Sequence, residues 1–323
     1  MTLAPERAHR SATEPLLAAP TPRAWLDEHL HAHLARHDGP DADSHRWVTY
    51  GELLDGGLAR LHAEVHAREG GTTQMVAKWV VTWTAGRVAD VVGFVLAAGG
   101  AGLLADTVGV GGDGLRWRQD PEGWADRLDV RGATLLVTPE HPWARLADVP
   151  VPPGQHRVEL VADEAELVTR TVDALVRAVR PLVDAVRGLA RVGARALWAE
   201  VADEVGMATL YQPQLPVRDD AVARLQAALQ APGAPWRVSP SVRTVSTSWG
   251  RAYLGQKGGC CLAYQRPDPD PVPDEEMTDA LREYHARFPP ERGTKRVCTT
   301  CSLRDPAGCA ERQLWWLEKS LAT

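Results

Sequence analysis

All five cysteines of this 323-residue chain lie in its last quarter. Cys260 and Cys261 are adjacent in the segment GGCCLAYQ, and the segment CTTCSLRDPAGC contains Cys298, Cys301 and Cys309. A chain that gathers its thiols in this way does not use them as ordinary small apolar side chains. The pattern predicts a metal site, a redox-active dithiol or disulfide bonds.

Disulfide bonds are the least favoured of these interpretations. The first ten residues, MTLAPERAHR, contain no apolar run of signal-peptide length, so we expect a cytoplasmic protein with reduced thiols. A chain of 323 residues also buries a sufficient core without disulfide bonds.

Zinc and iron–sulfur clusters differ in the cysteine spacing that they favour. Cys298 and Cys301 form one C-x-x-C knuckle, but structural zinc ordinarily takes a second knuckle, which the adjacent pair does not provide. A [2Fe–2S] cluster has two irons, towards which neighbouring side chains can diverge. The spacing therefore favours an iron–sulfur cluster, with zinc, a redox dithiol or inert thiols as the alternatives.

The C-C pair followed by C-x-x-C near the C-terminus resembles the signature of the FhuF-type ferric siderophore reductases. Residues 180–203, RPLVDAVRGLARVGARALWAEVAD, are similar to a helical segment that this family shares with siderophore synthetases, and residues 75–100 are similar more weakly. The resemblance covers about two thirds of the chain. It implies a cytoplasmic [2Fe–2S] enzyme that transfers one electron to an iron(III) siderophore of the hydroxamate or mixed carboxylate type and releases iron(II).

Carried over residue by residue, the resemblance assigns the cluster ligands to Cys260, Cys261, Cys298 and Cys301. The two pairs are separated by residues 262–297, a longer interval than in the family, but a longer loop adds only modest closure entropy. Cys309 is an additional thiol, either an alternate ligand or a packed side chain of a terminal helix. An electron-donating reductase or ferredoxin is the implied protein partner.

The residues around the cysteines suggest how a cluster is held and used. Glycine lets backbone approach closely, so we expect the amides of Gly255, Gly258 and Gly259 to donate to cluster sulfurs. Cations favour the added electron, and those near the cysteines are Lys257, Arg266, Lys295, Arg296 and Arg304. The candidates for contact with the chelate are Trp249, Arg251, Lys257 and Arg296. No catalytic residue is expected beyond the cluster ligands.

Other functional classes have weaker support. An electron carrier without chelate binding, a zinc-stabilised siderophore-binding module and a siderophore synthetase relative are the alternatives. A net charge of -6 without a basic stripe argues against a nucleic-acid partner. Residues 109–114, GVGGDG, match a dinucleotide fingerprint, but no helix start follows them, so we expect a turn. The His62 and His66 pair has metal-capable spacing, but a solvated helix face is favoured.

The rest of the chain predicts a mainly helical α+β protein with a small antiparallel sheet. We expect a disordered tail over residues 1–22, an α+β subdomain over 23–160 and a helical subdomain over 161–323 that carries the cluster. Helices are expected at 24–37, 49–69, within 163–207 and at 220–230. Strands are expected at 115–119, 126–130, 133–139 and 156–161, and an extended segment at 235–255.

Two further segments have definite expectations. Residues 75–104 are apolar but interrupted by Lys78, Arg87 and Asp90, which indicates a buried helix pair without stable membrane insertion. Between the cysteine pairs, RPDPDPVPD predicts an extended arm, and EEMTDALREYHARF predicts a helix. Its apolar stripe, Met277, Leu281, Tyr284 and Phe288, is expected to dock beside the cluster and shield one side of it.

Overall fold

The structure is a computed structural model that describes residues 22–29, 46–104, 114–119, 125–130, 132–152, 155–210, 217–262, 265, 278–288 and 300–322. Within these residues the protein is mainly helical α+β, as predicted. The predicted tail up to residue 21, most of GVGGDG and the proline-rich arm lie outside them. The predicted ligand Cys298 also lies outside them, as do the cations Arg266, Lys295 and Arg296.

Two apolar helices form the centre of the fold. Helices α5 (Thr73–Trp83) and α6 (Ala85–Gly99) are the predicted buried pair, and almost every residue of α6 is buried. Among the described residues, Thr73–Gly99 is long and apolar enough to cross a membrane, yet 83% of its most apolar window is buried within the protein. Such burial is typical of a core helix.

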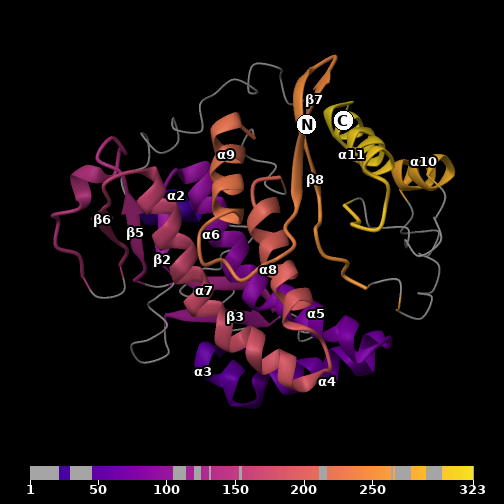
Figure 1. The fold of residues 1–323 in the computed structure, drawn as a ribbon, viewed down its shortest axis with the longest axis horizontal. Helices are drawn as coiled ribbons and strands as arrows, with labels where there is room; N and C mark the ends of the chain where they lie inside the picture. Colours follow the sequence, from indigo (N-terminus) through magenta and orange to yellow (C-terminus); the bar gives the residue numbers. More distant parts are fainter. Residues whose placement is uncertain are drawn as a thin grey trace.

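Three amphipathic helices surround this centre (Figure 1). Helix α7 (Glu164–Leu189) begins at Asp163, whose Oδ1 accepts a hydrogen bond from the Glu166 amide at 2.8 Å, as its capping sequence predicts. Helices α8 (Ala194–Met207) and α9 (Asp219–Leu229) also contact α6. One hydrophobic core extends from Trp25 to Trp236, across the predicted subdomain boundary. The boundary at residue 160 therefore marks a change of secondary structure within one core.

The helix predicted from Thr49 is broken. Thr49 and Glu52 form the expected capping box at α3 (Tyr50–Glu52), but a π-helical turn (Leu53–Gly57) separates it from α4 (Leu58–Glu69). Gly56 has φ +81°, a conformation that a helix excludes and that glycine adopts readily. The kink leaves Leu54 39% exposed, and it is Leu53 that is buried before Leu58. The preceding helix α2 (Pro22–His29) inserts Trp25 into the core.

The predicted strands form, but in two sheets. Strands β1 (Arg46–Thr49), β3 (Leu115–Gln119) and β4 (Ala125–Val130) make an antiparallel sheet. A second sheet contains β2 (Gly102–Leu104), β5 (Thr134–Val137) and β6 (Arg157–Leu160). β5 and β6 run parallel, because the chain between them returns through a 3-10 turn (Ala144–Leu146) to the same end of the sheet. The predicted small antiparallel sheet is therefore present, but β5 and β6 belong to a second, mixed sheet, and β1 and β2 were missed.

The predicted extended segment is a β-hairpin. Strands β7 (Ser241–Thr247) and β8 (Gly250–Gln256) pair antiparallel through a turn at Ser248 and Trp249. The terminal helix α11 (Pro306–Ala322) packs against β8, and Figure 1 shows the hairpin standing beside it. The hairpin thus delivers the chain from its exposed turn back to the protein body, where the adjacent cysteines follow.

The helix predicted between the cysteine pairs is present as α10 (Asp279–Arg287). Its apolar stripe docks, as expected: Tyr284 and Phe288 are buried, with ring centroids 5.4 and 6.4 Å from that of Trp315. The docking surface is α11, so the contact forms a small core of its own. Met277 lies outside the described residues, and shielding of the cluster by this helix stays a prediction.

Candidate metal centre

The end of β8 is joined to the second cysteine segment by three hydrogen bonds. The Gln256 side-chain amide donates to the carbonyl oxygens of Cys301, at 3.1 Å, and Arg304, at 2.9 Å. The Lys257 amide donates to the carbonyl oxygen of Thr300 at 2.9 Å. These bonds bring Cys301 to the chain just before Cys260, across more than forty residues of sequence. The fold therefore places the two predicted ligand segments side by side.

The described thiols influence one another electrostatically. Burial raises the pKa of the Cys260 thiol, and the neighbouring charges of Cys261 and Cys301 raise it further. Cys260 and Cys261 are half-buried and Cys301 is buried. Within the part of the chain that the structure describes, no three His, Cys, Asp or Glu residues are arranged to hold a metal ion. Three of the four predicted ligands are described, on two segments that the bonds from Gln256 and Lys257 join, and Cys298 is outside that part.

A backbone amide points at one of the cysteine sulfurs. The Leu262 amide donates to Cys260 Sγ at 3.4 Å. Leu262 has φ +59°, in the left-handed region that residues other than glycine seldom adopt. Such strain at a non-glycine residue is commonly found at functional sites. An N–H···S bond of this kind stabilises negative charge on sulfur and is one of the interactions that tune a metal–thiolate centre.

The predicted role of the glycine amides was wrong. Gly258 and Gly259 donate to the two carboxylate oxygens of Asp203, at 2.7 and 3.1 Å, and Gly255 donates to the Gln313 side chain at 3.0 Å. Glycine is needed here for packing instead. A Cβ on Gly259 would lie 2.9 Å from Ala199 Cβ, so the segment could not lie this close to α8. These amides fasten the backbone before the cysteines, and the Leu262 amide reaches the sulfur.

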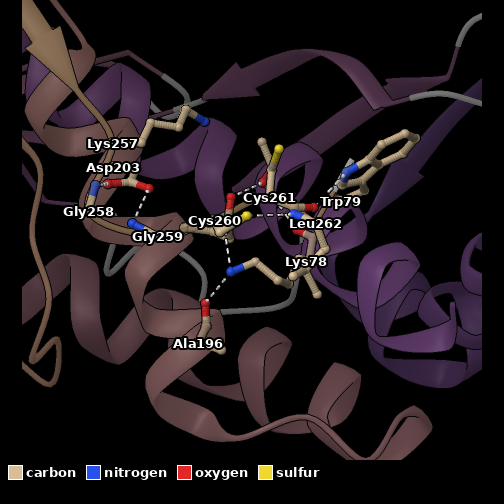
Figure 2. A network of polar contacts seen from close by, with 12 residues as sticks. Lys78, Trp79, Ala196, Asp203, Lys257, Gly258, Gly259, Cys260, Cys261 and Leu262 are labelled. Atoms are coloured by element: carbon tan, nitrogen blue, oxygen red, sulfur yellow. Dashed lines mark hydrogen bonds and ion pairs between the residues drawn. The ribbon is translucent and has the colours of Figure 1, made fainter. Parts of the chain in front are cut away.

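Helix α8 carries three carboxylates near the cysteine segment, those of Glu200, Asp203 and Glu204, and Figure 2 shows Asp203 beside Gly258 and Gly259. Burial, followed by the charge of Glu200, raises the pKa of Asp203 to about 7. Burial also raises the pKa of Glu204, against the lowering effect of Lys257. Lys257 Nζ lies 3.3 Å from Glu204 Oε1. Lys257, one of the cations predicted near the cysteines, therefore forms an ion pair with a residue of α8.

Helix α5 contributes two residues that the sequence did not single out as site residues. Trp79 Nε1 donates to the carbonyl oxygen of Cys261 at 3.2 Å, and the preceding Lys78 is buried beside the same segment (Figure 2). Both come from the N-terminal half of the chain, almost two hundred residues before the cysteines. The available signal was the lysine itself, because an apolar helix seldom contains a cation without a partner.

The predicted chelate-binding residues are not gathered at the cysteines. Trp249 is at the hairpin turn and 39% exposed, and Arg251 is paired with Asp219 at 2.7 Å. Arg251 and Lys257 are separated by the length of β8, about 20 Å at the usual rise of a strand. Lys257 alone of the described candidates adjoins the cysteine segment, and Arg296 lies outside the described residues.

Cys309 lies on the packed face of α11, as expected for a packed thiol. It is 1% exposed, and Gln313 Nε2 donates to its sulfur at 3.1 Å. The pKa of this thiol is raised, mainly by burial. The charge of Cys301 adds to the increase, and the charge of Arg304 opposes it. The charge of Cys301 therefore influences the thiols of both Cys260 and Cys309. Arg304, one of the cations predicted near the cysteines, lowers the pKa of the Cys309 thiol.

The raised pKa of Asp203 predicts a pH-dependent stability. Between its ordinary pKa of 3.8 and the folded value of about 7, the folded protein keeps a proton that the unfolded chain has lost. The free energy of unfolding should therefore fall as the pH rises through this window, by at most about 1.4 kcal/mol per pH unit. We expect urea unfolding to show wild type losing stability relative to Asp203→Asn from pH 5 to pH 7. A constant difference would contradict the assignment.

Two comparisons of this chain with known proteins give no match. No model of a known protein family matches it, and no curated protein matches it. The function is therefore argued from the residues and geometry of the site itself.

Proposed function

We propose that the protein is a ferric siderophore reductase in which Cys260, Cys261, Cys298 and Cys301 hold a [2Fe–2S] cluster. The observation that carries this proposal is the joining of the Cys301 segment to the chain just before Cys260, through the bonds from Gln256 and Lys257. The C-C and C-x-x-C pattern of the family that the sequence resembles supplies the same four residues.

The described residues fit such a cluster in their chemistry. The donors are thiols, which iron–sulfur clusters require, and the Leu262 amide already donates to one of the sulfurs. Asp203 and Trp79 hold the backbone on either side of the adjacent pair, so two neighbouring thiols are held in a fixed orientation. When bound, a [2Fe–2S] cluster supplies one-electron transfer.

The substrate is an iron(III) chelate, and the reaction adds one electron to it. The electron comes from an external reductase or ferredoxin, iron(III) becomes iron(II), and no covalent bond to the protein forms. The hard oxygen donors of a siderophore hold iron(II) more weakly than iron(III), so reduction brings about release. Cys260 and Cys261 are more exposed than Cys301, so we place the approach of the chelate on the side of the adjacent pair.

The proposed cluster also bears on the cellular compartment in which the protein works. Thiols that bind a cluster must stay reduced, which agrees with the cytoplasmic location expected from the sequence.

An electron carrier without chelate binding uses the same cysteines, so only the reaction with a chelate separates the two functions. A zinc-stabilised binding module would be colourless, whereas a [2Fe–2S] protein absorbs visible light.

The test is a stopped-flow titration of the anaerobically reduced protein with ferric hydroxamate, catecholate and citrate chelates. We expect reoxidation of the protein at a rate that saturates with one chelate class, together with one iron(II) trapped by a ferrous chelator per electron. The gallium(III) complex of the same siderophore is the control, because it binds alike but accepts no electron. It should inhibit without oxidising the protein. If the reduced protein reacts with none of the three chelate classes, the reductase function is wrong and the alternative of an electron carrier without chelate binding remains.

A further inference from the structure

A buried lysine from the first half of the chain lies beside the adjacent cysteines. Lys78 is on α5, a helix that is otherwise largely apolar, and its side chain is 4% exposed. A buried ammonium is costly unless it is paired, and well-packed apolar residues in place of a buried ion pair often leave a protein equally stable. Stability alone therefore gives no reason for a lysine at this position.

The ammonium is held against α8 by two contacts. Its Nζ lies 2.7 Å from Glu200 Oε1 and donates to the carbonyl oxygen of Ala196 at 3.1 Å. Glu200 is fully buried, and its second oxygen accepts a hydrogen bond from Thr82 Oγ1 at 3.1 Å. The charge of Lys78 is thus fixed in position by residues of two core helices.

Both charges of this ion pair lie near the cysteine segment, because Glu200 Oε1 would be 3.4 Å from a Cβ on Gly259, and of the two it is Lys78 that acts on a cysteine thiol. Lys78 lowers the pKa of the Cys260 thiol, whereas Glu200 acts on the carboxylates of Asp203 and Glu204. Figure 2 shows the Lys78 side chain extended beneath the cysteine segment. The next residue, Trp79, is hydrogen bonded to the Cys261 backbone, which fixes the register of α5 against the same segment.

We propose that Lys78 is a positioning residue that sets the reduction potential of the cysteine centre, by holding a permanent positive charge beside Cys260 with Glu200 as its counter-ion. This inference rests on the proposed function. An all-thiolate centre becomes more negative when it gains an electron, and net charge is one of the properties that set its potential. A fixed cation therefore favours the reduced state, and loss of the cation makes the potential more negative.

The charged groups around this centre give two opposite tests. Lys78→Met removes the cation and should lower the potential, while Glu200→Gln removes the counter-ion and should raise it. The expected shift is about tenfold in the equilibrium constant for reduction, or about 59 mV for one electron. Lys78→Arg keeps the charge and should stay near the wild-type potential. The measurement is an anaerobic redox titration followed by visible and EPR spectra.

Two further variants keep the test decisive. Lys78→Met/Glu200→Gln removes both charges without leaving either unpaired, so it replaces Lys78→Met if that variant does not fold, and it should also lower the potential. Arg170→Met is the control, because Arg170 pairs with Glu159 of β6 at 2.8 Å, and Figure 1 shows β6 on the opposite side of the molecule from β8, which the cysteines follow. It should leave the potential unchanged.

The outcomes separate this inference from the proposed function. Opposite shifts in the two single variants support the role of Lys78, because loss of a structural contact alone would move both in the same direction. Equal potentials in wild type, the double variant and Glu200→Gln, or shifts of one sign, would overturn it. Absence of a [2Fe–2S] spectrum from the wild-type protein would instead overturn the proposed function itself.

Discussion

Serine at Cys260, Cys261, Cys298 or Cys301 is expected to abolish or strongly perturb the visible and EPR spectra of the purified protein. Each change replaces a thiolate ligand by a hydroxyl, which binds iron of this kind far more weakly. Cluster binding is coupled to the folding of the segments that supply the ligands, so the stability of the C-terminal region should fall as well. The measurements are iron and sulfide content, spectra and thermal unfolding of each variant.

Cys309→Ser is the matched control for these four variants. The hydroxyl is small enough for the buried site on α11 and can still accept the hydrogen bond from Gln313. We expect its spectra and iron content to equal those of wild type. Loss of colour in this variant, with retention in one of the other four, would show that Cys309 is a ligand and that the assigned set is wrong.

Gly258→Ala is expected to reduce both stability and iron content. A Cβ at this position would lie 2.6 Å from the carbonyl carbon of Ser239, and backbone cannot yield as a flexible side chain can. The displacement would also pull the Gly258 amide away from Asp203, whose carboxylate is fully buried. Overpacking and the disturbed buried hydrogen bond together predict a loss of about 3 kcal/mol in the free energy of unfolding.

The same substitution elsewhere should have the opposite effect. Gly188 lies in α7, and a Cβ added there would have no neighbouring atom within 4 Å, so alanine meets no obstacle. Its better helix propensity predicts a gain of about 0.5 kcal/mol. Urea unfolding and iron analysis of both variants provide the comparison. Wild-type iron content and stability in Gly258→Ala would contradict the close contact with Ser239.

Much of the secondary structure was predictable because its causes are local. Three such features each act within a single helix, and all three are present. They are the capping box of Thr49 and Glu52, the cap at Asp163 and the apolar period of α7. The strands β3 to β6 were also predicted in place. Their pairing was not, because alternation of apolar residues states which side of a strand is buried and says nothing of its neighbour or direction.

The site was predictable only in part. The clustering of thiols named the ligand candidates, and hydrogen bonds from Gln256 and Lys257 join the Cys301 segment to the chain just before Cys260. Assignment by proximity in sequence failed for Arg251, which the hairpin carries away from the cysteines, and for the amides of Gly258 and Gly259, which bind Asp203. Neighbours along a chain need not share an environment once a strand or a turn separates them.

The sequence by itself determined the helical character of this protein and named its candidate ligands, because side-chain type and short-range periodicity are properties of local segments. Only the tertiary structure decided which distant residues surround the cysteines. Lys78, Trp79 and Asp203 reach them through the packing of α5 and α8, whose partners are chosen by burial of apolar surface. That driving force has no direction along the chain, so the polar contacts it brings together follow from the complete fold.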